Sequence, residues 1–240
     1  MIKEAIEYIV KLANTRLEEA NGQQYSTQPL HLVSEPRVKS LTLNSLSGLV
    51  DYLKSGFDKD GFDSIDQRLI HVSSPTEVYV YSHFNRDMER NIFIQTKALI
   101  PQIRYGYFYD VEEFNIAIQS MFVVNPDKEM VLKVIGNIKD ENVTTFGDDG
   151  VSQQVTAKVG VATVANIKVP NPVLLKPYRT FVEVDQPESA FVFRMKSGPE
   201  CALFEADGGA WKNEAMANVR AYLTSELSSL IESQQVVIIA

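Results

Sequence analysis

Four carboxylates in two acidic turns are the first residues whose types and spacing suggest chemistry. Asp148 and Asp149 lie between two glycines, and Glu205 and Asp207 come just before a Gly-Gly pair. If the turns converge, these side chains are candidate Mg²⁺ ligands for a metal-dependent phosphoryl-transfer enzyme. The same residues also suit local structure, because Gly-Asp-Asp-Gly is typical of a hairpin turn and Asp207 is placed to cap a helix. We favour the structural interpretation and keep the metal site as an alternative.

A segment without acidic residues, from Gly150 to Val182, suggests an anion-binding surface. Its cations are Lys158, Lys168, Lys176 and Arg179. Together with nearby aromatic rings they are candidates to bind single-stranded nucleic acid or a nucleotide through phosphate contacts and stacking. The alternative partner is the acid-rich C-terminal region of another subunit, since complementary charge steers association. We favour the subunit contact, because the cations are sparse along the segment.

The other reactive side chains form no recognised catalytic pattern. The sequence has no phosphate-binding glycine loop, no nucleophile elbow and no zinc-protease helix. Cys201 is the single cysteine, which excludes an intramolecular disulfide, and we expect a buried structural thiol. The sequence thus favours a non-enzymatic protein and indicates no cofactor.

Composition is that of a globular protein, with 45% hydrophobic and 22% charged residues among 240. The net charge of −8 argues against a protein that coats duplex DNA. No apolar run approaches the roughly 20 residues needed to cross a bilayer. Early carboxylates interrupt any signal-peptide pattern at the N-terminus. We therefore expect a cytoplasmic protein without membrane contact.

Apolar residues at helical spacing predict several helices. An N-terminal helix that ends before Asn21-Gly22 has one apolar face, formed by residues from Ile2 to Ala13, which needs a partner. A second helix is expected to begin with Ser40 or Thr42 as N-cap and to end at Gly56. Residues 111–138 predict a helical hairpin, and a long helix is expected after Asp207.

Alternating apolar residues predict strands between and after these helices. We expect a protruding hairpin at about 78–98, with a charged tip, and a second hairpin that joins residues 178–184 to 191–195. The apolar terminus should be buried by pairing into a sheet or a subunit contact, which makes its residues candidate assembly residues: Val236, Val237, Ile238 and Ile239. The predicted fold is a single α+β domain over residues 1–240, with a mixed or antiparallel sheet.

Four stretches of the chain resemble a bacteriophage and prophage family of unknown function, the family that includes the YfdQ prophage protein. They are residues 147–158, 169–173, 177–181 and 202–211. The resemblance implies a phage-encoded protein made in the bacterial cytoplasm, and it brings no reaction, cofactor or catalytic residue. The apolar terminal strand, the charged hairpin tip, the separate basic and acidic segments and the absence of catalytic motifs favour a non-enzymatic protein that self-assembles into a closed homo-oligomer, as a ring or a shell-like particle. A nucleic-acid or nucleotide-binding accessory protein of phage DNA metabolism or counter-defence is the alternative.

Overall fold

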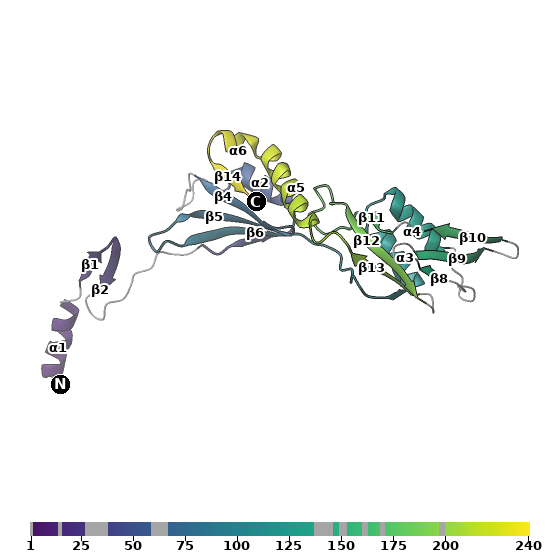
Figure 1. The fold of residues 1–240 in the computed structure, drawn as a ribbon. Helices are drawn as coiled ribbons and strands as arrows, with labels where there is room; N and C mark the ends of the chain where they lie inside the picture. The colour runs from purple at the N-terminus through teal and green to yellow at the C-terminus, as the bar shows by residue number, and fades with distance from the viewer. Residues whose placement is uncertain are drawn as a thin grey trace.

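The chain adopts the α+β fold that its sequence predicts. The computed structural model describes residues 2–13, 16–26, 38–58, 67–136, 146–148, 153–159, 163–168, 171–196 and 200–240, with the backbone alone for 11–13 and for the strands between 146 and 168. Figure 1 shows two lobes side by side and an N-terminal arm that projects from one of them. Within the described residues, no helix is long and apolar enough to cross a membrane.

The first lobe is a five-stranded mixed sheet covered by helices on one face (Figure 1). Its strands, in spatial order, are β14 (Val236–Ile239), β4 (Arg68–Ser74), β5 (Glu77–Phe84), β6 (Arg90–Lys97) and β3 (Leu41–Leu43). The inner pairs are antiparallel, whereas β14 and β3 join the two edges in parallel. The covering helices are α2 (Leu46–Ser55), α5 (Trp211–Glu226) and α6 (Ser228–Glu232).

The predicted hairpin at 78–98 is confirmed as β5 and β6, and it forms the middle of this sheet. Val78, Val80 and Ile94 are buried under α2 and α5, as the two-residue alternation requires. Pairing with β4 stops at Tyr81, and pairing with β3 stops at Ile94. The hairpin therefore extends beyond its neighbours only at its tip.

The second lobe is a four-stranded antiparallel sheet with two helices packed against it. The strands, in spatial order, are β11 (Val173–Leu175), β12 (Ser189–Lys196), β13 (Glu200–Glu205) and β7 (Tyr109–Asp110). The helices are α3 (Val111–Met121) and α4 (Pro126–Gly136), the predicted helical hairpin. The Asn125 side chain accepts a hydrogen bond from the Lys128 amide at 2.8 Å and so caps α4.

A separate three-stranded antiparallel sheet follows α4 along the chain. It contains β8 (Phe146–Asp148), β9 (Gln153–Val159) and β10 (Thr163–Lys168), with β9 in the middle. The β8–β9 pairing matches the hairpin predicted from Gly-Asp-Asp-Gly, although residues 149–152 of the connection lie outside the described part.

Two predicted helix starts are wrong. Helix α2 begins after Ser45, whose hydroxyl accepts a hydrogen bond from the Gly48 amide, because residues 41–43 are drawn into the sheet as β3. Its predicted end is confirmed, since Gly56 has the left-handed φ of 61° that favours glycine. Helix α5 begins at Trp211, and Asp207 lies outside it in a turn, where its carboxylate accepts from the Gly209 amide.

The predicted hairpin between 178–184 and 191–195 is also wrong. Residues 178–188 form an irregular loop, and Phe191 pairs with Val173 of β11 and Glu205 of β13. The Gln186 side chain is the physical reason. Its oxygen accepts from the Arg179 and Thr180 amides, and its nitrogen donates to the Phe181 and Val184 carbonyls, which replaces the partners of a strand ladder.

The buried side chains form two clusters, one in each lobe. One contains α3, α4 and the four-stranded sheet, and the other contains α2, α5, α6 and the five-stranded sheet. The division does not follow the order of the chain, because Phe181 and β14 join the cluster built around residues 46–94. The single domain over residues 1–240 therefore stays a prediction.

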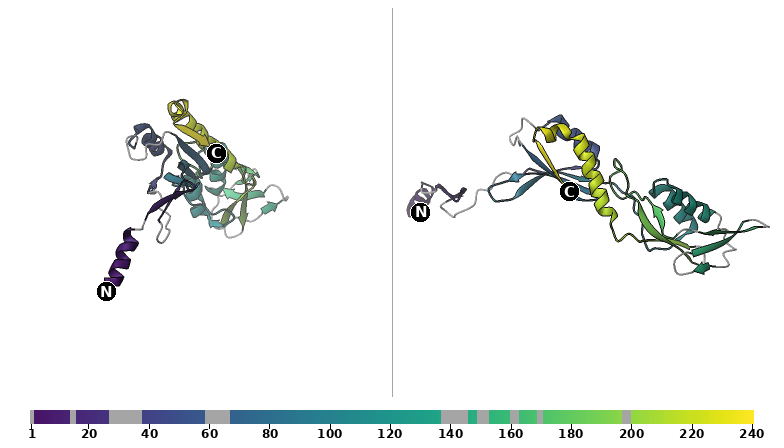
Figure 2. Two further views of the ribbon diagram at one scale, coloured as in Figure 1. Left: turned by 90° about the vertical axis from the view of Figure 1, so that its left-hand side faces the viewer. Right: turned by 45° about the horizontal axis from the view of Figure 1, so that its top comes forward.

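An N-terminal arm completes the fold. Helix α1 (Ile2–Ala13) is followed by a two-stranded antiparallel hairpin of β1 (Leu17–Ala20) and β2 (Gln23–Ser26). The predicted end of the helix before Asn21-Gly22 is wrong, because residues 17–20 pair with β2 and Asn21-Gly22 forms the turn of that hairpin. The right-hand view of Figure 2 places the arm beyond the tip of the β5–β6 hairpin, as Figure 1 does. The contact there includes a hydrogen bond of 2.7 Å from the Gln23 side-chain amide to Asp87.

The predicted terminal strand is confirmed as β14, but its burial is only partial. Val236 is 3% exposed and Ile238 packs at the margin of the core, whereas Val237 and Ile239 are 43% and 42% exposed. The strand is at the edge of the sheet, and only one of its faces lies beneath helices. In such a strand, every second side chain points away from the helices, so it contacts either solvent or a partner.

Replacing Val236 with alanine should lower the free energy of unfolding by about 2 kcal/mol, because it removes two buried methyl groups and leaves a cavity. Val237→Ala is the matched control on the exposed face and should change it by less than about 0.5 kcal/mol. Urea denaturation monitored by circular dichroism measures both. Equal effects of the two substitutions would show that β14 does not pack as described.

Candidate functional site

Arg179 is the centre of the most polar buried site among the described residues. It lies in the 178–188 loop and is only 5% exposed, although it carries a full charge. Its amide is held by the Gln186 side chain at 3.0 Å. Thr180, the next residue, donates from its hydroxyl to the Pro75 carbonyl in the turn between β4 and β5, at 2.5 Å. The loop is thereby fastened to both lobes.

The guanidinium of Arg179 contacts two carboxylates that follow one another along the chain. Its Nη1 lies 3.2 Å from Glu205 at the end of β13, and its Nη2 lies 3.8 Å from Asp207. Nη2 also donates to the Ser189 hydroxyl, which in turn donates to Asp207 at 2.5 Å. One cation, one hydroxyl and two carboxylates thus form a continuous polar network.

Aromatic rings enclose the same guanidinium. Its carbon lies 3.9 Å from the centroid of Trp211, at the start of α5, and 5.7 Å from that of Phe191 in β12. Such contacts favour a guanidinium with few waters around it. Within the described residues, Arg179 Nε, the Tyr105 hydroxyl and Trp211 Nε1 have no hydrogen-bond partner. The charge pairs and the ring contacts therefore provide the stabilisation of this site.

The electrostatics of the site follow from burial and from this pairing. Burial lowers the pKa of Arg179, while the surrounding groups, including Asp207 and Glu205, oppose that shift. Burial raises the pKa of Tyr105, so its hydroxyl stays protonated. For Asp207, burial raises the pKa, but hydrogen bonds from Ser189 and Gly209 and the charge of Arg179 outweigh it and leave the pKa below its usual value.

These contacts make the site a clamp between the two lobes. Leu175 and Phe191 belong to one hydrophobic cluster and Phe181 to the other, so the chain crosses between the clusters once through Arg179 and again between Phe181 and Phe191. A third crossing runs from β13 through Asp207 and Trp211 into α5. The Arg179 cluster, defined here as Arg179, Ser189, Glu205, Asp207 and Trp211, joins these three, whereas the crossing from β6 to Ile103 lies outside it.

The predicted anion-binding residues are not brought together by the described structure. Arg179 forms ion pairs with carboxylates of its own chain. We had expected the opposite charge to come from another subunit. Lys176 is half-buried next to β11. Lys158 and Lys168 lie on β9 and β10, where Lys158 pairs with Val164, but their side chains are outside the described part. The nucleic-acid hypothesis for these residues stays a prediction.

Only two of the four predicted metal ligands have side chains in the described part of the structure. Glu205 and Asp207 both contact Arg179, whereas Asp149 and the side chain of Asp148 lie outside the described part. Among the described residues, no three His, Cys, Asp or Glu side chains converge as metal ligands do. Cys201 is fully buried in β13, and burial raises the pKa of its thiol to about 12, so it is the structural thiol that we expected.

Sequence patterns did not single out Ser189 and Trp211 as members of the Arg179 cluster, or Gln186 as the residue that holds its loop. Ser189, Trp211 and Gln186 are ordinary residues of a strand, a helix and a loop until the fold brings them to Arg179. One signal was present: Arg179 stands between Pro177 and Phe181 in a segment otherwise poor in charge. An arginine that is buried in such a segment needs an acidic partner.

Comparisons with protein-family models, with curated proteins and with solved structures found no match. Function is inferred from the residues alone. The resemblance to a phage family therefore stays a prediction.

The lowered pKa of Asp207 makes stability depend on pH. An unfolded aspartate has a pKa of about 3.9, so ionised Asp207 stabilises the fold above that pH, and this stabilisation is lost as the pH falls through the lower folded value. Asp207→Asn should lower the free energy of unfolding by about 1–2 kcal/mol at pH 7 and should flatten its decline below about pH 4. Denaturation curves from pH 7 to 2 measure this, with Glu188→Gln as the exposed control. Parallel pH profiles for wild type and Asp207→Asn would contradict the network.

Proposed function

We propose that the protein is a non-enzymatic, phage-encoded assembly protein whose N-terminal arm joins copies of the chain into a closed homo-oligomer. The observation that carries the proposal is the apolar face of α1. Ile2, Ile6, Ile9 and Val10 are 79%, 55%, 62% and 51% exposed. Each such side chain contributes roughly 1.5–3 kcal/mol when it is fully buried, so a contact that covers the face is strongly favoured.

The arm is too small to be stable without a partner. Helix α1 has 12 residues, and isolated helices of this length are marginal in water. The β1–β2 hairpin is two-stranded, and β1 is exposed along its whole length. Neither hydrophobic cluster includes a residue of the arm. Neither core of the lobes therefore stabilises the arm, and a partner that covers the apolar face of α1 would do so.

A second copy of the chain is the partner that we favour. When every copy extends one arm and receives another, the contact is head-to-tail, and a suitable rotation closes it into a ring. The two edge strands of the five-stranded sheet, β14 and β3, provide further surface at which copies can meet. The exposed side chains of β14, Val237 and Ile239, add apolar area to this surface.

A double substitution in α1 tests the proposal. Purified wild-type protein should show a multiple of its 27.0 kDa mass in light scattering at micromolar concentration. Ile6→Asp with Ile9→Asp should reduce that mass to the monomer or to a smaller species, because it places two charges on the apolar face. The lobes should stay folded, since their cores contain no residue of α1.

The matched control replaces two exposed residues on the opposite face of α1, Glu4→Ser with Tyr8→Ser, and should keep the wild-type mass. A wild-type protein that is monomeric at micromolar concentration over a range of salt would rule out the proposed function. An oligomer whose mass is unaffected by the α1 substitutions would rule out the arm as its joint.

A further inference from the structure

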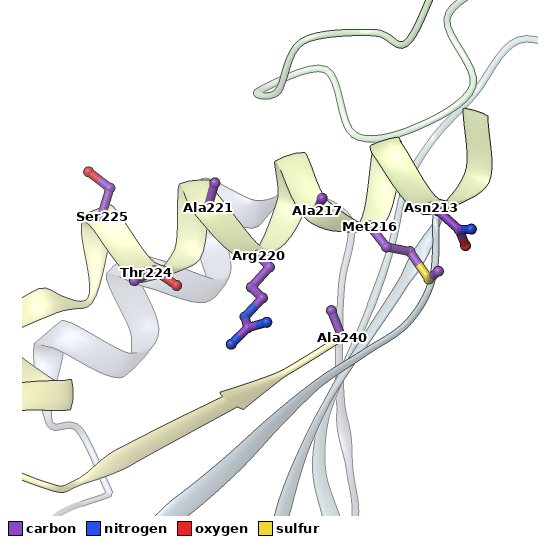
Figure 3. A pocket seen from close by; sticks show the side chains of 8 residues that line it. All are labelled: Asn213, Met216, Ala217, Arg220, Ala221, Thr224, Ser225 and Ala240. Atoms are coloured by element: carbon purple, nitrogen blue, oxygen red, sulfur yellow. The ribbon is translucent and has the colours of Figure 1, made fainter. Parts of the chain in front are cut away.

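A groove lies along the outer face of α5, beside the end of β14. It encloses about 790 Å³ and is lined by one stripe of α5 and by the C-terminal residue: Asn213, Met216, Ala217, Arg220, Ala221, Thr224, Ser225 and Ala240. Figure 3 shows Arg220 and Met216 extending from α5 toward the strand, and Ala240 at the strand's end. Most of this wall is made of short side chains. Short side chains allow another helix to approach the axis of α5 closely.

The groove and α1 are complementary in length and in side-chain size. At 1.5 Å per residue, the 12-residue helix α1 and the stretch of α5 from Asn213 to Ser225 both span about 18 Å. The apolar stripe of α1 carries large branched side chains, whereas Ala217 and Ala221, at mid-length of the groove beside Arg220, are small. Large side chains of one helix fit the shallow surface of the other, as in ridge-into-groove packing.

Charge at the groove also suits α1. Arg220 has no ion-pair partner within the described part of the chain, and it lines the groove. On α1, Glu7 is exposed and lies beside the apolar stripe. A carboxylate that borders an apolar helix face can pair with a cation at the rim of its binding groove and so fix the register.

The arrangement of the arm points to a groove on a different copy. Figures 1 and 2 place α1 beyond the tip of the β5–β6 hairpin and apart from α5 of its own chain. The hydrogen bond from Gln23 to Asp87 fastens the base of the arm at that tip. We infer that α1 of one copy seats its apolar face in the α5–β14 groove of a second copy. The inference rests on the proposed function and identifies the contact that joins the copies.

Disulfide cross-linking between two differently tagged copies tests this joint. One copy carries Ile6→Cys, at the middle of α1, and the other carries Ala217→Cys or Ala221→Cys, at the middle of the groove. These middle positions meet whether the two helices run parallel or antiparallel. On mixing at pH 8 with a mild oxidant, the heterodimer should form at least tenfold faster than with Glu226→Cys, an exposed position on the other side of α5. Native Cys201 should not react, because it is buried and its thiol has a pKa of about 12.

A second variant keeps the test independent of cysteine chemistry. Ala221→Trp fills the groove and should reduce the oligomer to a smaller species, whereas Glu226→Trp should leave its mass unchanged. An oligomer that forms normally but gives no preferential cross-link overturns the inference and leaves the proposed function standing. A cross-link only within one chain carrying both cysteines overturns it too, because α1 would then occupy its own groove. A wild-type monomer overturns the proposed function as well.

Discussion

The Arg179 guanidinium determines how the two lobes of the molecule are joined. It is buried where the chain crosses between the hydrophobic clusters, and a buried charge requires partners that stay in place. Glu205 and Asp207 provide the opposite charge, and Ser189 connects β12 to the same network. The end of β13, the start of β12 and the start of α5 are therefore held around one side chain. Displacing the end of β13 would take the carboxylates away from a guanidinium that is almost fully buried.

The sequence predicted most of what depends on neighbouring residues. Helix α4, the end of α2 at Gly56, the β5–β6 hairpin and the terminal strand all follow from local spacing and local chemistry. The errors came from long-range contacts. Gln186 holds residues 178–188 in a loop although they alternate like a strand, and parallel pairing with β6 takes residues 41–43 away from α2. At the site, Arg179 and Glu205 were assigned to different functions because they are 26 residues apart, and only the fold shows that they neutralise each other.

The two structural roles in this chain are physically separate. The clamp at Arg179 lies between the lobes, whereas the arm begins at the far end of the five-stranded sheet (Figure 1). The clamp fixes α5 through Trp211, and α5 also forms a wall of the groove along its exposed face. A rigid α5 presents Ala217 and Ala221 in a constant position, which lowers the entropic cost of receiving a second helix. Assembly on this account uses a surface whose position is set by a buried ion pair elsewhere in the molecule.

Native-state hydrogen exchange at low denaturant measures the central claim directly, namely that Arg179 couples the unfolding of the two lobes. In the wild type, amides of β5–β6 and of β12–β13 should exchange through one common opening reaction with the same free energy. In Arg179→Met the openings should separate, because removing one partner of a buried pair costs about 3–5 kcal/mol and breaks the shared network. Wild-type lobes that already open with different free energies, or a variant in which both still open together with unchanged free energy, would contradict the account.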